Sequence, residues 1–154
     1  MLRSLRNQSN TALARGPGLI GMLWLVGLLG ILVWLDGLHD GVFLVPPFAA
    51  TASILLYLPD VPIAQPIPVV FGSTCGAAIG TAATWIVGFG PVPALVAAVV
   101  AAIALPLARI YHPPGVALAL YPALLHPGAW FALHVVLPVT LLAVASATLV
   151  RRLS

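Results

Sequence analysis

Long apolar runs without a charged residue recur along the whole chain, and they restrict its fold to one built within a lipid bilayer. Only 6% of the 154 residues are charged, and the mean hydropathy is +1.15. Each run is close to the roughly 20 apolar residues that a helix needs to cross a bilayer. We therefore predict an all-α, multi-pass integral membrane protein surrounded by the lipid bilayer.

Glycine and proline residues divide this sequence into six predicted membrane-embedded segments. They fall at about 18–35, 46–58, 67–88, 92–110, 113–126 and 129–150. The order of a long, a short and a long segment occurs twice, so residues 18–150 are interpreted as one transmembrane domain of two three-segment repeats, about 18–88 and about 92–150. Each repeat is predicted to hold a short proline-initiated helix, broken or re-entrant, between two long transmembrane helices.

The few charged residues predict how the chain is oriented. Positive side chains flank both ends of the apolar sequence: Arg3, Arg6, Arg15, Arg151 and Arg152. Because flanks rich in arginine stay in the cytoplasm, we expect residues 1–17 to form a cytoplasmic flank and both termini to be cytoplasmic, in a bacterial inner (plasma) membrane. This sparse positive charge predicts no nucleic-acid partner.

The number of crossings depends on whether the two short segments cross or re-enter. If both cross, Arg109 lies on the side of the termini, with Asp36 and Asp40 opposite, which satisfies the positive-inside rule. If both re-enter, four crossings leave Arg109 outside. Three segments per repeat would also invert one repeat relative to the other, an arrangement found in many transporters.

Two proline pairs stand at the starts of the short segments, Pro46-Pro47 and Pro113-Pro114. Proline removes a donor and clashes with the preceding turn inside a helix, but it suits a helix's first turn. Each pair therefore predicts a helix that begins at mid-membrane depth. The free N–H groups and the positive dipole end of such a helix favour an anion.

Just before the second proline pair stand Arg109, Tyr111 and His112. The following proline fixes His112 in an extended backbone form, and its imidazole can donate to an anion or carry a proton near neutral pH. Arg109 offers a fixed positive charge, although snorkelling to the cytoplasmic interface explains it equally well. His39, His126 and His134 are interpreted as a solvated loop residue, a turn residue and a packing residue.

The sequence lacks the parts of an enzyme or a metal centre. It has no glutamate and no known catalytic or phosphate-binding motif, and its three aspartates lie in predicted loops. Cys75 is the only cysteine, and no two histidines have convincing metal-binding spacing. We therefore expect no catalytic activity, no metal ion and no cofactor.

Gly72, Gly76 and Gly80 lie on one face of the segment at about 67–88. Small residues let helix backbones approach closely, so packing within or between subunits is the expected role. The alternative is that the glycines make room for a permeation path, with hydroxyls such as those of Ser73 and Thr81. A homodimer is the first expectation for the assembly, because closed two-fold symmetry is the commonest arrangement.

Three ordered motifs resemble those of the HPP family of integral membrane proteins, which is named for its His-Pro-Pro motif. They are PFAATA at residues 47–52, AQP at 64–66 and YHPPG at 111–115. The resemblance implies a membrane protein usually described as having four helices, and some members in plastids and cyanobacteria are associated with nitrite transport. Ala49 and Gly115 stand where the family motif has glycine and alanine.

The helix starts and the resemblance together predict transport of a small inorganic monoanion, with nitrite as the first expectation. The predicted binding residues are Pro47, Phe48, Ala49, Thr51, Ser53, Gln65, Arg109, His112, Pro113, Pro114 and Gly115. Backbone N–H groups and hydroxyls would bind the anion, Arg109 would attract it, and Gln65 would either close over it or cap its own loop. The alternatives are a channel for another small solute and a non-transporting assembly protein.

Overall fold

A computed structural model describes residues 17–39 and 41–153 of the protein. All regular structure in these residues is helical, and they contain no strand. The all-α prediction is therefore confirmed. The predicted flank at 1–17 lies outside the described residues except for Pro17, and so does Asp40.

The helices follow the predicted segments closely. They are α2 (Leu19–Asp36), α3 (Pro46–Tyr57), η1 (Pro62–Ala64), η2 (Pro68–Gly72), α4 (Ser73–Val87), α5 (Pro91–Leu107), α6 (Pro113–Leu118), α7 (Tyr121–Leu125), η3 (Ala132–Val136) and α8 (Leu137–Leu153). The elements η2 and η3 are π-helical turns that lead directly into α4 and α8. Within the described residues, three helices are long and apolar enough to cross a membrane: Leu19–Asp36, Pro68–Val87 and Ala132–Leu153.

Both proline pairs begin a helix, as predicted. Helix α3 begins at Pro46 and α6 at Pro113, and the residues before them, Val45 and His112, are extended with φ of −91° and −134°. Proline fixes its own φ near the helical value and keeps the preceding residue out of the helical region. Each pair therefore ends an extended stretch and starts a helix at a defined residue.

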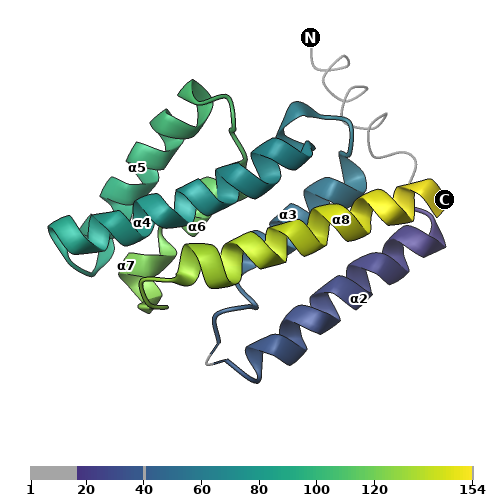
Figure 1. The fold of residues 1–154 in the computed structure, drawn as a ribbon, viewed down its shortest axis with the longest axis horizontal. Helices are drawn as coiled ribbons and strands as arrows, with labels where there is room; N and C mark the ends of the chain where they lie inside the picture. The colour runs from purple at the N-terminus through teal and green to yellow at the C-terminus, as the bar shows by residue number, and fades with distance from the viewer. Residues whose placement is uncertain (1–16, 40, 154) are drawn as a thin grey trace, which may run out of the picture.

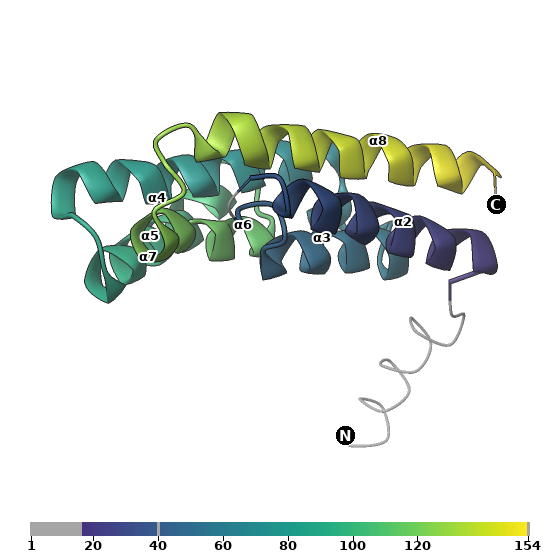
Figure 2. The same cartoon turned by 90° about the horizontal axis from the view of Figure 1, so that it is seen from below.

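Helices α4 and α8 run in opposite directions through the middle of the molecule (Figure 1). Helices α2 and α3 pack beside α8, whereas α5, α6 and α7 pack beside α4. Helices α3 and α6 both begin near the middle and extend toward opposite ends (Figure 2). They also contact each other, so each lies beside the start of the other.

Several connections meet at one end of the molecule, which we call the arginine end. Residues from separate parts of the chain line a hollow of about 150 Å³ there, among them Pro17, Leu55, Pro59 and Arg151. The connection at 58–65 also meets the connection at 108–112, because the Ile63 carbonyl accepts a hydrogen bond from His112. The start of α2, the end of α5 and the end of α8 therefore lie at the same end.

The other connections meet at the opposite end, which we call the histidine end. Residues that line a hollow there include His39, Phe43, His126 and His134. The Gly90 N–H donates to the Ala123 carbonyl at 2.9 Å, which joins the α4–α5 connection to α7. Through the described residues, successive helical segments thus alternate in direction between the two ends, with α3 and α6 beginning near the middle (Figure 2).

The three glycines of the small-residue face pack against backbone within the same chain. A Cβ atom added at Gly72, Gly76 or Gly80 would overlap the carbonyl oxygens of Ile110, Gly115 and Ala119 respectively. The missing side chains therefore allow α4 to lie against α6 and the residues before it. This confirms the packing role, and it leaves no open path along the glycines.

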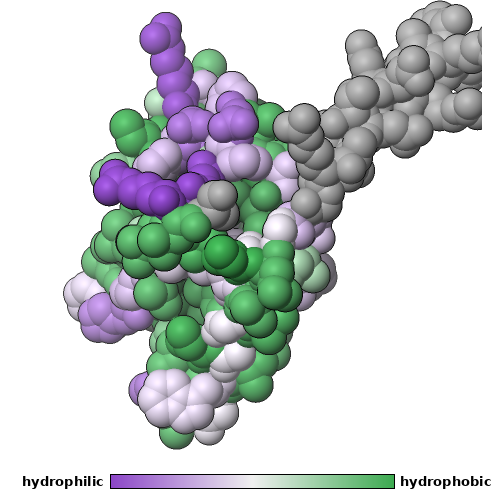
Figure 3. Space-filling view, turned by 90° about the vertical axis from the view of Figure 1, so that its right-hand side faces the viewer, coloured by the Kyte–Doolittle hydropathy of each residue, from purple (hydrophilic) through white to green (hydrophobic). Residues whose placement is uncertain are grey.

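Most of the outer surface is apolar, as a bilayer requires. Large hydrophobic side chains point outward, such as Ile86 with 84% and Leu107 with 79% of its surface exposed. In the view that faces the end of α8, hydrophilic side chains gather in one part and hydrophobic ones cover most of the rest (Figure 3). The chain is thus a multi-pass membrane protein with its charges gathered away from the apolar surface.

Candidate functional site

The junction of the two proline-pair helices is formed by a buried histidine and a buried threonine. His112 stands before α6 and Thr51 lies in α3, and their side chains are 0% and 1% exposed. The Oγ1 atom of Thr51 lies 3.0 Å from Nε2 of His112. This bond joins positions that are 61 residues apart, and it connects the two predicted repeats.

The other nitrogen of His112 fixes the protonation pattern of the ring. Its Nδ1 atom lies 2.8 Å from the carbonyl oxygen of Ile63. A carbonyl oxygen can only accept, so Nδ1 carries the proton and Nε2 of the neutral ring accepts from the Thr51 hydroxyl. His112 thus ties α3, the η1 segment and the start of α6 together, and the neutral ring has no donor to spare.

Thr51 differs from other threonines in the bundle. Thr81 and Thr140 each donate to the carbonyl four residues earlier in their own helix, at 3.1 and 2.8 Å. The hydroxyl of Thr51 instead bonds to His112 on another element. Its side chain therefore belongs to the junction rather than to its own helix.

Ser73 carries a buried polar atom with no partner. Its Oγ is the one buried side-chain nitrogen or oxygen in the described part of the chain that makes no hydrogen bond. Ser73 opens α4 directly after the π-helical turn, and its backbone lies close to Gly115. A buried hydroxyl without a partner costs free energy unless a ligand or water completes it.

These groups define what the junction can do chemically. If His112 gains a proton, both ring nitrogens become donors, and Nε2–H must donate to Thr51 Oγ1. The Thr51 hydroxyl keeps its proton, and its O–H group is then free to donate to another acceptor. Because a buried positive charge without a counter-ion is costly, protonation of this ring and arrival of an anion favour each other.

Three predicted binding residues lie away from this junction. The exposed Ser53 hydroxyl donates to the Ala49 carbonyl of its own helix at 2.9 Å. The exposed Gln65 amide donates to the carbonyls of Pro59 and Val61 at 3.3 and 3.4 Å, which matches the loop-cap alternative. Arg109 is exposed at the arginine end, with a left-handed φ of 59°.

The helix starts are more closely packed than an open anion site requires. The N–H groups of Phe48 and Gly115 already donate to the carbonyls of Val45 and His112, at 3.0 and 2.8 Å. Pro47, Phe48, Pro114 and Gly115 are buried, and Ala49 and Pro113 are half-buried. Among the groups described so far, the donor available for an anion is therefore the Ser73 hydroxyl rather than these two N–H groups.

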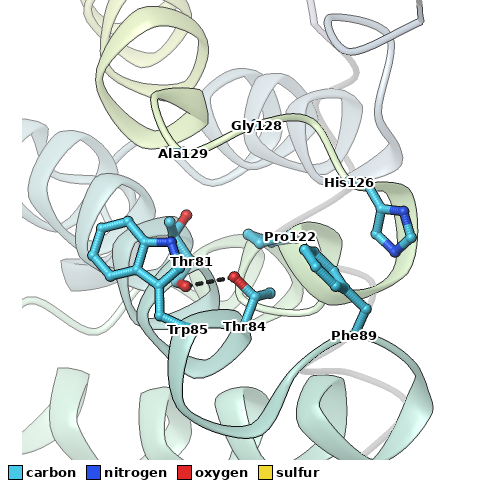
Figure 4. A pocket seen from close by; sticks show the side chains of 8 residues that line it. All are labelled: Thr81, Thr84, Trp85, Phe89, Pro122, His126, Gly128 and Ala129. Carbon is cyan, nitrogen blue, oxygen red and sulfur yellow. Dashed lines mark hydrogen bonds between the residues drawn. The ribbon is translucent and has the colours of Figure 1, made fainter.

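A second, smaller hollow of about 100 Å³ lies beside the histidine end (Figure 4). Thr81, Thr84, Trp85, Phe89, Pro122 and His126 line it, together with residues 128 and 129. The Thr84 hydroxyl donates to the Thr81 carbonyl at 2.7 Å. The Thr81 and Thr84 hydroxyls both donate within their own helix, and a hydroxyl-lined path stays a prediction.

Three histidines that were interpreted separately from the sequence gather at the histidine end. His39, His126 and His134 line the same hollow. No group of three or more possible ligands in residues 17–39 and 41–153 could hold a metal ion. The signal that could have revealed this grouping is the alternation of the six segments, since it puts all three residues at one end.

Comparison with known proteins identifies the family. The profile of the family described as HPP, transmembrane region, matches residues 9–154, which is nearly the whole chain. Comparisons with curated proteins and with solved structures give no significant match. The resemblance carried by the three motifs is thereby confirmed.

Proposed function

The chain belongs to the HPP transmembrane-region family, and on that premise we propose that it transports a small inorganic monoanion, with nitrite as the first candidate. The observation that carries this proposal is the buried His112–Thr51 pair between two helices that start in the interior. Polar and ionisable groups are expensive inside a membrane protein, and function is the default explanation for them. The unpartnered hydroxyl of Ser73 adds a donor nearby.

The proposed mechanism couples the anion to a proton. In the resting state Thr51 donates to the neutral His112 ring. A proton that reaches Nε2 reverses this bond, and the Thr51 hydroxyl turns its proton toward an oxygen of the anion. The ring and the anion then neutralise each other in the low-dielectric interior, and release of both on the far side restores the starting bond.

The proposed topology has six crossings in two inverted three-segment repeats. Its support is the alternation of the segments between the arginine end and the histidine end. Arg109, Arg151 and the start of α2 share one end, and Asp36 leads into the other, as the positive-inside rule requires for cytoplasmic termini. In addition, both third segments open with a π-helical turn, at Pro68–Gly72 and Ala132–Val136.

Two alternatives make different predictions. An assembly protein would present its small-residue face to a partner, but Gly72, Gly76 and Gly80 are covered within the chain. A channel for another small solute would pass that solute without a proton. The homodimer stays a prediction. The glycine face gives it no support, because that face packs against backbone of the same chain.

Nitrite uptake into proteoliposomes tests the proposal. Uptake should require the protein and increase when an inward proton gradient is imposed. Thr51→Val removes the hydroxyl at nearly constant volume and should reduce uptake about tenfold or more, which corresponds to one hydrogen bond to a charged group. Thr140→Val is the matched control, because Thr140 is equally buried and bonds only within its own helix.

Four outcomes would contradict the proposal. Uptake equal to that of protein-free liposomes would show that the protein does not transport nitrite. Unchanged uptake in Thr51→Val would show that the His112–Thr51 bond takes no part in transport. Passage of glycerol or potassium without nitrite would favour the channel, and a stable assembly without any flux would favour the assembly role.

A further inference from the structure

A hollow of about 660 Å³ lies at the histidine end, and three titratable side chains line it. Its lining consists of His39, Val42, Phe43, Leu125, His126, Pro127, His134 and Val135. The three histidines come from different parts of the chain: the α2–α3 connection, the end of α7 and the turn η3. We call these three side chains the histidine mouth.

Each imidazole of the histidine mouth is held against an aromatic ring. His126 meets the edge of Phe89 with ring centroids 4.3 Å apart, and His134 stacks on Trp130 at 5.5 Å with planes inclined by 14°. The His39 ring lies 5.5 Å from Phe43. These ring contacts position the three side chains around the hollow.

The backbone at His126 also points to a specialised position. His126 ends α7 in the left-handed region, with φ of 53° and ψ of 46°. This conformation is uncommon for a residue other than glycine, and it tends to persist where the surroundings require it. Here it aims the imidazole between the two hollows at this end, since His126 lines both of them.

The histidines are the only titratable side chains among the described residues that line this hollow. The carboxylate of Asp36 is nearby, but its Oδ1 accepts from the N–H groups of Phe43 and Leu44, both at 2.8 Å. Tyr121 packs against the buried cluster below. Arg109 and Arg151 lie at the opposite end, and Asp40 lies outside the described residues.

We propose that His39, His126 and His134 form a binding site for a small inorganic anion at the entrance of the protein, and that protonation of their imidazoles switches the site on. This inference rests on the proposed anion transport for its purpose. An imidazole can donate to an anion and can also take up a proton, and three imidazoles line this one hollow. A hollow with charge of one sign raises the local concentration of the opposite ion.

The histidine mouth is separated from the junction by apolar packing. Val135 belongs both to its lining and to a buried cluster that includes Phe48, Leu118 and Phe131. The cluster closes the floor of the hollow. Binding at the mouth can therefore be measured without any transport event.

Trp130 provides the readout, because it stacks on His134. The full-length protein in detergent is titrated with iodide, an anionic quencher of tryptophan fluorescence, at constant ionic strength and at about pH 5.5 and 7.5. The Trp130 signal is the difference between the wild type and Trp130→Phe. We expect saturable quenching with an apparent affinity about fivefold or more higher at the acidic pH, whereas the neutral quencher acrylamide should show no such difference.

The variant His39→Gln/His126→Gln/His134→Gln, checked by circular dichroism for helix content, should lose the saturable phase. Arg152→Gln is the control, since it removes an exposed cation from the last turn of α8, at the opposite end, and should leave quenching unchanged. Linear, pH-independent quenching in the wild type would overturn the inference. Saturable binding without nitrite flux would uphold the site and contradict the proposed transport. Nitrite flux without saturable binding would uphold transport and contradict the site.

Discussion

The two proline-pair helices begin in the same way and differ in the chemistry at their starts. The residue before α3 is Val45, which joins Phe48 and Leu118 in an apolar cluster. The residue before α6 is His112, which bonds to Thr51. The two starts thus form one apolar and one polar junction in the middle of the same bundle.

The positions involved correspond between the two halves. Thr51 lies five residues after Pro46, and Leu118 lies five residues after Pro113. His112 bonds to Thr51, whereas Val45 lies in the same apolar cluster as Leu118, so the corresponding positions carry different chemistry. The proline pair sets the backbone geometry, whereas the preceding residue sets the chemistry, so one scaffold can carry an asymmetric site.

Removing the close contact of α6 should have the largest effect on this comparison. Gly76→Val places a side chain where the Gly115 backbone lies, and backbone atoms cannot move aside as a side chain can. We expect a loss of about 3 kcal/mol or more of stability, at the upper end of overpacking effects. Thermal unfolding in detergent, followed by size-exclusion chromatography, measures it.

Gly27→Val is the matched control, because no atom lies within 4 Å of a Cβ built there. Helix α6 follows His112 of the polar junction and carries Leu118 of the apolar cluster, so Gly76→Val should disturb both. Equal stability of the two glycine variants would show that the close approach of α4 and α6 is not required.

Converting the polar junction into a copy of the apolar one should have the next largest effect. His112→Val leaves the Thr51 hydroxyl and the Ile63 carbonyl unpaired, which costs about 2 kcal/mol. Thr51→Leu alone leaves Nε2 of His112 unpaired at a similar cost. The double variant should be less destabilised than the sum by about 1 kcal/mol, because contacting residues are coupled.

Unfolding of the four proteins in mixed micelles gives this coupling. Nitrite uptake should be lost in all three variants, including the double variant with the partly restored stability. Val45→Ala truncates the apolar junction and separates the two readouts, since it should lower stability by about 1–2 kcal/mol without changing uptake. Additive costs at His112 and Thr51 would mean that their bond contributes nothing as a pair.

The smallest expected effect concerns how α3 ends. The Arg151 guanidinium donates to the Leu55 carbonyl at 2.9 Å, near the last turn of α3. Arg151→Met retains the aliphatic stem and removes the donor, so we expect a loss of about 1 kcal/mol or less for this exposed residue. Arg152→Met should lie within about 0.5 kcal/mol of the wild type, as surface substitutions usually do. A larger effect at Arg152 would contradict the capping role of Arg151.

Much of the fold could be predicted from local sequence. The boundaries of α2, α3 and α5 follow from apolar length and from the proline and glycine residues between segments. The close approach at Gly72, Gly76 and Gly80 also follows from residue spacing. The element that packs against this face could not be predicted. Residue spacing shows that some backbone can approach the glycines, but it does not identify which one.

The candidate site was only partly predictable. His112 and Thr51 were both expected to contribute, yet their direct bond was not expected, because it joins residues 61 positions apart. Ser53 was expected beside Thr51, but two positions along a helix turn a side chain to a different face. The unpartnered Ser73 and the gathered histidines depend on contacts among several elements, which a single segment does not encode.

The sequence by itself determined that this protein lies in a membrane and where its helices begin. It also determined that Gly72, Gly76 and Gly80 share one helix face. These properties depend on hydrophobicity and on backbone restrictions that act over a few residues. The sequence also shows that valine precedes one proline pair and histidine the other. Only the tertiary structure decided which groups on other elements these two residues meet. Hydrogen bonds between buried groups require both partners in position, and packing of separate elements alone brings His112 to Thr51 and the three remaining histidines to one end.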